Sequence, residues 1–263
     1  MYQEKLMGKK GRTLILAYDH GLEHGPIDFN LNSADPDFIF DIAVKSKVSG
    51  VVVLSGLAEQ YGRKYGFFLP LIVKLNGKSS IGEGEPYSAQ FCSVERAAKL
   101  GASAVGYTIY LGSEEEAKIF KEFGQIVEEA HSRQLPVIAW VYPRGKAVKD
   151  DLSTEILAYA GRTALELGAD IVKLKYNGDF EGFKWVVKNA GLCDVVVAGG
   201  EKEEDPLSFL RSVKEVLDAG AKGVAVGRNV WQSENPLGML DALTKLIFHD
   251  VPPEKAVMYV NKI

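Results

Sequence analysis

The stretch LELGADIVKLKYNGD, residues 165–179, contains one complete passage from a helix into a strand. LELG has the form of a helix ending, with Gly168 as the stop after the last turn. Ile171, Val172 and Leu174 then form an apolar run of the kind that is buried on both faces of a sheet. The endings AKLGASA and LDAGAKG repeat this passage before other strand-like runs. The chain therefore alternates helices with strands, which favours an α/β fold with parallel strands.

Short strand-like runs recur along the whole chain, and helical patterns separate most of them. The runs cover residues 13–19, 50–54, 71–76, 104–110, 136–142, 171–176, 194–200 and 223–229. Such a series of βα units fits a (β/α)8 TIM barrel, here a single domain over residues 1–263. The alternative is a doubly wound open sheet, which usually has a glycine-rich fingerprint after its first strand. LAYDHGLEHG does not supply that fingerprint.

Several helix boundaries can be placed from capping residues. Asp35-Pro36 combines an N-cap residue with proline at the first helical position. Ser113 and Glu116 have the spacing of a capping box before a helix that runs towards Ser132. The remaining helical periodicity covers residues 155–167, 182–189, 205–218 and 235–248. Residues 20–33 form a long loop, and long loops of this kind are often functional.

The bulk composition excludes several classes of protein. The chain has 263 residues, is 46% hydrophobic and 25% charged, and carries a net charge of −4. It has no basic block, so we expect no nucleic-acid partner, and no apolar run of membrane-spanning length. Cys92 and Cys193 are far apart and form no metal-ligand pattern. Two isolated thiols, together with a polar start without a signal peptide, indicate a reducing cytoplasm and no zinc site.

Polar residues gather at the ends of the predicted strands. In a barrel of this type the functional residues lie at the C-terminal ends of the strands. The residues at those ends are Asp19 and His20; Lys74 and Asn76; Thr108 and Tyr110; Trp140, Tyr142 and Arg144; Lys173 and Lys175; and the endings AGG and GRN. Buried polar groups cost free energy unless they are paired or used. An internal ion pair explains any one of them, such as Lys74, but the whole set predicts a shared active-site mouth.

The last two strands end in glycines that suit a phosphate. Gly199-Gly200 and Gly227-Arg228 lie where such barrels commonly hold a phosphate on backbone N–H groups. The arginine adds a charge suited to phosphate oxygens. The plainer alternative is two tight turns and a surface arginine. The nearby Glu201, Glu203, Glu204 and Asp205 are expected to point outwards and to complement the start of the following helix.

Lys173 and Lys175 stand two apart in one strand, so their side chains point the same way. Their Cα atoms are then about 6.6 Å apart, and two ammonium groups at that distance repel by roughly 2.5 kcal/mol at a dielectric constant near 20. That repulsion favours a neutral, nucleophilic amine. We expect the deeper Lys173 to be the nucleophile, Lys175 to supply repulsion and an anion contact, and Tyr142 to exchange protons. Alternatively, Asp19 or another acid neutralises both lysines in a structural cluster.

Several stretches of the chain resemble a known family. LAYDHGLEHGP, KLNGKS, LGASAVGYTIY, WVYPRG, LELGADIVKLKYNGD and GVAVGRNVWQ are similar to motifs of the archaeal-type class I fructose-1,6-bisphosphate aldolases. They run from about Gly11 to Trp231 in the expected order. The resemblance implies a (β/α)8 barrel, a phosphorylated sugar substrate and a covalent Schiff base without metal or cofactor. It also implies a homo-oligomer, such as a decamer or another high-order ring.

The resemblance also implies roles for individual residues. The Schiff-base lysine falls on Lys173, the proton-donating tyrosine on Tyr142 and the aspartate of the D-H motif on Asp19. The implied substrate contacts fall on His20, His24, Trp140, Arg144, Lys175, Ala198, Gly199, Gly200, Gly227 and Arg228.

The chain departs from the family pattern at the seventh strand. Ala198 stands where the family often has serine, which removes a hydroxyl contact to phosphate, and EKEED is more acidic than the usual turn. These departures concern phosphate affinity and substrate range and leave the carbonyl chemistry untouched. Two other functions also stay open. One is a related Schiff-base synthase or thiolase that acts on another phosphorylated ketone, and the other is a non-catalytic protein that binds a phosphate ligand.

Overall fold

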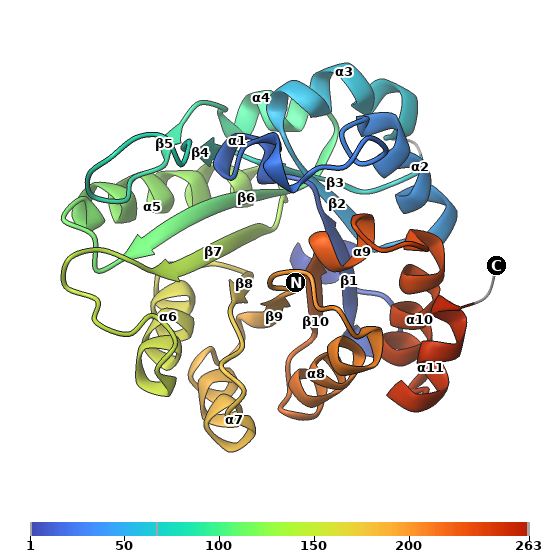
Figure 1. The fold of residues 1–263 in the computed structure, drawn as a ribbon. Coiled ribbons are helices and arrows are strands. Elements are labelled where there is room, and N and C mark those ends of the chain that lie inside the picture. Colours follow the sequence, from blue (N-terminus) through green and yellow to red (C-terminus); the bar gives the residue numbers. More distant parts are fainter. Residues whose placement is uncertain (1, 67, 262–263) are drawn as a thin grey trace.

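The centre of the molecule is a closed barrel of parallel strands (Figure 1). The structure is a computed structural model that describes residues 2–66 and 68–261. Around the barrel the strand order is β1-β10-β9-β8-β7-β6-β3-β2. The barrel strands are β1 (Thr13–Ala17), β2 (Gly50–Leu54), β3 (Leu71–Lys74), β6 (Ala102–Leu111), β7 (Val137–Pro143), β8 (Ile171–Leu174), β9 (Asp194–Ala198) and β10 (Gly223–Val226). Pairing of β1 with β10 closes the barrel, so the predicted (β/α)8 fold is confirmed and an open sheet is excluded.

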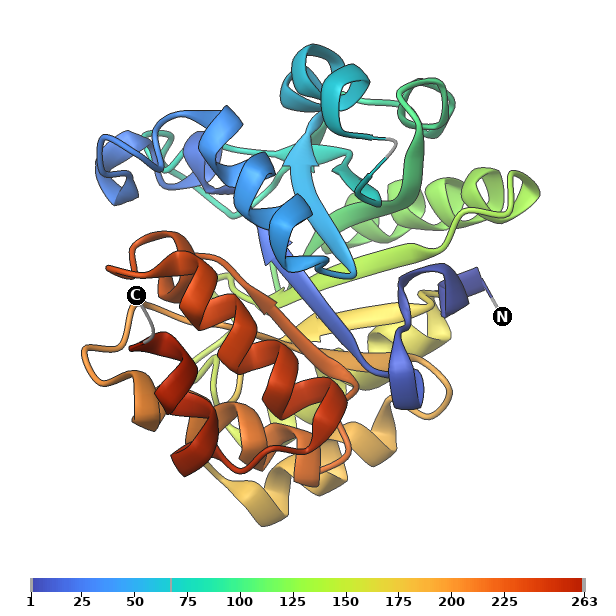
Figure 2. The same ribbon diagram turned by 90° about the vertical axis from the view of Figure 1, so that its right-hand side faces the viewer.

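Helices form the outer layer around the barrel. They are α2 (Pro36–Ser46), α3 (Ser55–Tyr65), α4 (Val94–Lys99), α5 (Glu116–Ser132), α6 (Thr154–Glu166), α7 (Phe180–Asn189), α8 (Pro206–Asp218), α9 (Arg228–Trp231), α10 (Pro236–His249) and α11 (Pro253–Val260). The last long helices, α10 and α11, pack side by side, and α10 also contacts α2 (Figure 2). The first and last parts of the chain therefore close the helical layer together.

Alternation along the strands decides which side chains enter the barrel. Ile15, Val52, Ile72, Ile138 and Ile171 belong to one buried cluster inside it. A second cluster holds the side chains between the strands and the helices. Because Ile171 points inwards, the residues two and four further along β8 and its extension point towards the C-terminal end of the interior. This geometry brings both lysines of the strand to the mouth of the barrel.

The N-terminal segment covers the opposite end of the barrel. It contains two short 3-10 helices, η1 (Tyr2–Leu6) and η2 (Lys9–Gly11). Leu6 is 1% exposed and belongs to the cluster inside the barrel. That end is therefore filled by apolar side chains, which leaves the C-terminal end for a site.

Most of the predicted helix starts are confirmed. Asp35 accepts a hydrogen bond from the N–H of Asp37 and caps α2, and Pro36 follows it. Asp205 caps α8 and Asn235 caps α10 in the same way. These starts could be predicted because each cap is a contact between residues that are close in sequence.

The capping box predicted at Ser113 and Glu116 is wrong. The Ser113 hydroxyl donates to the carbonyl of Pro86 and accepts from the N–H of Glu115. The Glu116 carboxylate accepts from the N–H of Gly112, and α5 begins only at Glu116. The polar residues at this helix start therefore bind a distant loop and the preceding turn.

Other elements were not predicted. The helices α3 and α11 were missed, as was the short antiparallel pair β4 (Asn76–Gly77) and β5 (Ala89–Gln90). For α4 the sequence predicts the ending, AKLGASA, but not the start at Val94. The loop at residues 20–33 contains α1 (His20–Glu23) and η3 (Pro26–Asp28). Among residues 2–66 and 68–261, no helix combines the length and the apolar character that a membrane span requires.

Candidate active site

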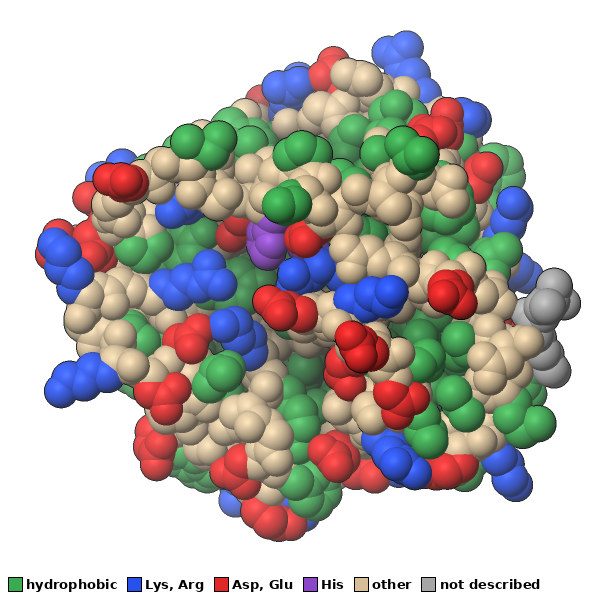
Figure 3. All heavy atoms as spheres, viewed as in Figure 1, with side chains coloured by type: hydrophobic (Ala, Val, Ile, Leu, Met, Phe, Trp, Pro, Cys, Tyr) green, Lys and Arg blue, Asp and Glu red, His purple; other side chains and the backbone are tan. Residues whose placement is uncertain are grey.

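A cavity of about 580 Å³ opens at the C-terminal ends of the barrel strands. In Figure 3, lysine and arginine side chains and a histidine surround a hollow, with carboxylates on its rim. The predicted site residues that line the cavity are Asp19, His20, His24, Tyr142, Arg144, Lys173, Lys175, Ala198, Gly199, Gly200, Gly227 and Arg228. Trp140, the remaining predicted residue, is buried in the barrel interior next to it.

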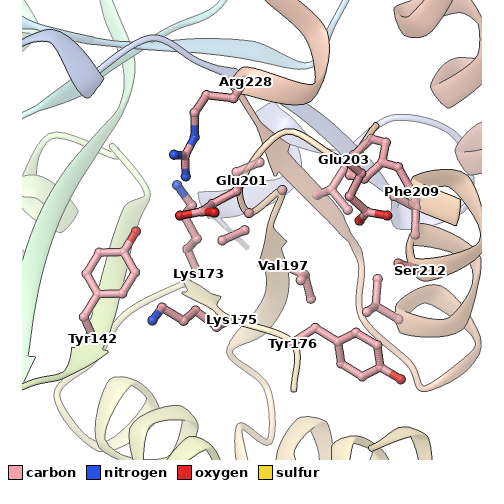
Figure 4. A pocket seen from close by; sticks show the side chains of 18 of the residues that line it. Tyr142, Lys173, Lys175, Tyr176, Val197, Glu201, Glu203, Phe209, Ser212 and Arg228 are labelled. Carbon is pink, nitrogen blue, oxygen red and sulfur yellow. The ribbon is translucent and has the colours of Figure 1, made fainter. Parts of the chain in front are cut away.

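Lys173 projects from β8 into the cavity (Figure 4). It is only 5% exposed. Burial lowers the pKa of its ammonium group, and the cations of Lys74 and Arg228 act in the same direction. The carboxylates of Asp19 and Glu23 oppose this effect, but the pKa still lies below the ordinary value for lysine. The neutral amine is therefore more accessible here than on a surface lysine.

Lys175 lies at the cavity wall. It is not among the main cations that lower the pKa of Lys173, which is the role that the sequence predicts for it. Its ammonium donates to the carboxylate of Asp151 at 2.6 Å, and its side chain is 32% exposed. The cations that depress the pKa of Lys173 are instead Lys74 and Arg228. The prediction that Lys173 is the deeper of the two lysines is confirmed.

Lys74, at the end of β3, forms a buried network with two carboxylates. Its ammonium donates to Asp19 at 3.0 Å and to Glu23 at 3.2 Å, and the Tyr110 hydroxyl donates to the other oxygen of Glu23. Burial alone would raise the pKa of Asp19, but Lys74 and Lys173 hold it well below its usual range. Asp19 is therefore an anion at neutral pH. The internal ion pair considered for Lys74 is therefore present. The alternative in which an acid neutralises both Lys173 and Lys175 is not supported, because Lys175 pairs with Asp151 and, among the described residues, no carboxylate pairs with the Lys173 nitrogen.

The ring of Trp140 lies close to both buried lysines. The centroid of its ring lies 5.6 Å from the Lys173 nitrogen and 5.8 Å from the Lys74 nitrogen. The ring packs over Gly106 of β6, where a Cβ atom would come within 2.1 Å of the indole. A glycine at this position is what leaves room for the tryptophan inside the barrel.

Tyr142 lies one residue before the end of β7 and presents its phenol to the cavity (Figure 4). Burial raises the pKa of this phenol above its ordinary value, so the group is protonated at neutral pH. The guanidinium of Arg144 lies 5.1 Å from the centroid of its ring. Tyr142 can therefore donate a proton, while Arg144 adds positive charge at the entrance.

The loop after β1 supplies two histidines and a carboxylate. Burial lowers the pKa of His20 to about 4, although Asp19 opposes this, so its imidazole is neutral at pH 7. The His24 ring nitrogen lies 3.3 Å from Asp28, whose carboxylate also lies 3.7 Å from Arg228. Asp28 therefore holds His24 and Arg228 on the same side of the cavity.

The glycines after β9 and β10 approach the cavity with little side-chain bulk. A Cβ atom on Gly199 would lie 2.9 Å from Val226, and one on Gly227 would lie 2.9 Å from both the Ala17 carbonyl and the His20 ring. Gly200 has a φ of +68°, a left-handed conformation that favours glycine. Gly199 donates its N–H to the Ala225 carbonyl, so this N–H does not take the phosphate-binding part that the sequence predicts for it.

The acidic run after β9 differs from the prediction. Both Glu201 and Glu203 line the cavity, whereas the sequence analysis expects them to point outwards (Figure 4). Asp205 behaves as predicted, because its carboxylate accepts from the N–H groups of Leu207 and Ser208 at the start of α8. Part of the negative charge of this loop thus faces the cavity that also contains the glycines predicted to bind a phosphate.

Asn229 fixes the same loop from the far side. Its amide donates to the carbonyls of Gly199 and Glu201, both at 2.7 Å, and its oxygen accepts from the N–H of Glu203 at 2.8 Å. It is 3% exposed. The conformation of the glycine segment therefore depends on one buried amide.

Sequence reasoning missed several residues of the site. They are Glu23, Asp28, Asp151, Glu201, Glu203 and Asn229. Most act on a partner that is distant in the chain, which a local pattern cannot reveal. One signal was available: an inward-facing Lys74 needs a carboxylate, and Glu23 lies in the first loop of the same mouth.

Among the described residues, no three His, Cys, Asp or Glu side chains are grouped so that they could hold a metal ion.

Comparison with known proteins now places the chain in a family. The model of the DeoC/LacD family aldolases matches residues 13–233, a span that includes all the barrel strands. The chain belongs to the DeoC/LacD aldolase family. It is 50% identical over 246 residues to the class 1 fructose-bisphosphate aldolase of Thermoproteus tenax, which covers 93% of this chain and 92% of the relative. It is 45% identical over 258 residues to the class 1 fructose-bisphosphate aldolase of Halobacterium salinarum, and this match covers 97% of this chain and 98% of the relative.

Solved structures support the same placement of this DeoC/LacD aldolase. An archaeal fructose-1,6-bisphosphate aldolase, whose catalytic lysine is covalently bound to the carbinolamine intermediate of its substrate, matches with a TM-score of 0.90. Its sequence is 48% identical, and the match covers 94% of this chain and 98% of that chain. The fructose-bisphosphate aldolase of Slackia heliotrinireducens matches with a TM-score of 0.92 at 31% identity, covering 99% and 88%.

Proposed function

We propose that this protein is a class I fructose-1,6-bisphosphate aldolase. It reversibly cleaves the sugar into dihydroxyacetone phosphate and glyceraldehyde 3-phosphate through a Schiff base. The observation that carries the proposal is the buried amine of Lys173, which lies in the cavity and has a lowered pKa. The similar archaeal aldolase with a carbinolamine on its catalytic lysine supports the same chemistry for this chain.

The reaction begins at Lys173. Its neutral amine attacks the C2 carbonyl of the open-chain sugar and forms a carbinolamine, which loses water to become an iminium. Tyr142, after giving its proton to the leaving water, takes the proton of the C4 hydroxyl; the C3–C4 bond breaks, its electron pair moves to the positive nitrogen, and glyceraldehyde 3-phosphate leaves. Protonation of the resulting enamine at C3 and addition of water to the iminium release dihydroxyacetone phosphate and restore the amine. Tyr142 donates and accepts protons in the imine and carbanion steps, since its phenol is protonated and faces the cavity. Asp19 is an anion beside the amine and orients it or stabilises the iminium.

The two phosphates are assigned from the positive groups of the cavity. Backbone N–H groups of Gly200, Gly227 and Arg228, with the guanidinium of Arg228, suit the C1 phosphate. Arg144 and His24 are the candidates for the distal phosphate, because they lie at the entrance on other loops. Lys175 supplies a further positive charge at the wall of the cavity.

Borohydride trapping tests the mechanism. Reduction in the presence of dihydroxyacetone phosphate should attach its mass to the peptide that contains Lys173, and the adduct should still form after treatment with EDTA. Lys173→Ala should abolish both the adduct and cleavage of the bisphosphate. Lys175→Ala is the matched control, and it should keep the adduct at Lys173. Bisphosphate cleavage that survives in Lys173→Ala would reject the proposal.

We also propose that residues 1–263 form a single domain, that the protein is cytoplasmic, and that it assembles into a homo-oligomer. The described thiols Cys92 and Cys193 are both free and buried, as suits a reducing compartment. Large apolar side chains at Ile27, Leu31 and Ile81 are 88%, 96% and 90% exposed, which suits an assembly surface. One unfolding transition, cell fractionation and light scattering test the three statements in turn.

A further inference from the structure

The amine of Lys173 is surrounded by charged and titratable groups from several elements. Around it stand Asp19, His20 and Glu23 after β1, Lys74 of β3, Tyr142 of β7 and Arg228 after β10. Two of these groups are carboxylates that could pair with a buried ammonium. A carboxylate paired with Lys173 would favour the charged form, which cannot attack a carbonyl.

The ammonium group of Lys74 forms ion pairs with both carboxylates. Its nitrogen lies 3.0 Å from Oδ2 of Asp19 and 3.2 Å from Oε2 of Glu23, and it is 2% exposed. The other oxygen of Asp19 faces His20 at 3.7 Å, and the other oxygen of Glu23 accepts from Tyr110 at 3.2 Å. Within residues 2–66 and 68–261, no hydrogen bond or ion pair reaches the Lys173 nitrogen.

We propose that Lys74 is a positioning residue of this active site: its ammonium occupies the carboxylates of Asp19 and Glu23 and so prevents them from pairing with Lys173. The inference rests on the proposed function, because it assigns a reason for the reactive state of the Schiff-base lysine. It also explains why the barrel holds two lysines close to one tryptophan ring, with their nitrogens 5.8 and 5.6 Å from its centroid. Lys74 is the charged partner of the two carboxylates, and Lys173 can therefore remain a neutral amine.

The two partners of the ion pair should act on Lys173 with opposite signs. Loss of Lys74 removes a cation that lowers the pKa of Lys173 and releases two carboxylates that raise it. Loss of the charge on Glu23 removes one of the groups that raise it. A role of Lys74 in folding alone would give no such reversal of sign.

The experiment is a pH profile of two quantities for each variant: kcat/KM for the bisphosphate, and the rate of borohydride-trapped adduct formation at Lys173 with dihydroxyacetone phosphate. The acidic limb of both reports deprotonation of the amine in the free enzyme. In Lys74→Met the limb should move to higher pH by at least about one unit, which lowers the rate about tenfold on that limb. In Glu23→Gln it should move to lower pH.

Lys64→Met is the matched control, because it removes an exposed lysine that pairs with Asp37 far from the cavity. The acidic limb of its two pH profiles should stay at the same pH as in the unchanged protein. Should Lys74→Met fold poorly, the double variant Lys74→Met with Glu23→Gln leaves only Asp19 to pair with Lys173, and its limb should still move to higher pH. A limb that stays in place in the soluble Lys74 variants, while trapping at Lys173 persists, overturns this inference alone. Absence of trapping in the unchanged protein overturns the proposed function as well.

Discussion

At the scale of single residues, the burial of His20 has a cost that depends on pH. Its imidazole packs edge-on against Trp231 and His24 and is 16% exposed. Burial lowers its pKa from the ordinary value near 6.5 to about 4. Between these values the unfolded chain binds a proton at this position and the folded chain does not. The folded state therefore loses stability as the pH falls through this window.

A His20→Gln variant should flatten the dependence of stability on pH. The free energy of unfolding of the unchanged protein should fall by up to about 3 kcal/mol between pH 6.5 and pH 4 because of this histidine. Stabilisation by the ionised Asp19 and Glu23, whose pKa values are lowered, is lost only below about pH 4.5. Urea unfolding at pH 7.0 and 5.0 measures the difference. His249→Gln, which removes an exposed histidine at the end of α10, is the control, and equal slopes in the two variants would contradict the assignment.

At the scale of elements, the segment between β9 and α8 depends on Asn229. This buried amide makes three hydrogen bonds to the segment, and α9 holds it in place. Asn229→Ala should loosen the glycines of the proposed phosphate site and raise KM for the bisphosphate about tenfold, at a cost of about 1–3 kcal/mol in stability. Steady-state kinetics and thermal unfolding check both. Asn189→Ala, which removes a half-buried amide bound to the Trp185 carbonyl away from the cavity, is the control. An unchanged KM in a folded Asn229→Ala protein would rule out this role.

The elements that could be predicted from the sequence are those set by neighbours in the chain. The alternation of β8 predicts that Lys173 lies inside, and caps such as Asp35 give helix starts, since both depend on residues a few positions apart. The failed capping box shows the opposite case, because the Ser113 hydroxyl is taken by Pro86, 27 residues away. The same limit explains why the sequence predicts that Lys175 repels the ammonium group of Lys173. Nothing near Lys175 in the chain indicates that its own ammonium group pairs with the carboxylate of Asp151.

At the scale of the whole molecule, an acidic protein surrounds a site that must attract an anion. The net charge is −4, whereas Arg144, Lys175 and Arg228 bring positive charge to the cavity. The family pattern could predict these cations, since they lie at strand ends. It could not predict that Glu201 and Glu203 would line the same mouth, because the direction of a loop side chain is set by long-range contacts such as those of Asn229. The charge of the mouth is therefore a balance of the two signs.

This balance predicts how salt and Glu201 affect capture of the bisphosphate. Raising the ionic strength from 10 to 150 mM shortens the screening length from about 30 to about 8 Å, so kcat/KM should fall as the attraction of the cavity cations is screened. Glu201→Gln removes a carboxylate that lines the cavity, and it should raise kcat/KM several-fold at low salt and steepen the salt dependence. Glu204→Gln makes the same charge change on an exposed residue of that loop that does not line the cavity. If both variants gain equally, the effect belongs to net charge and not to the position of Glu201 in the mouth.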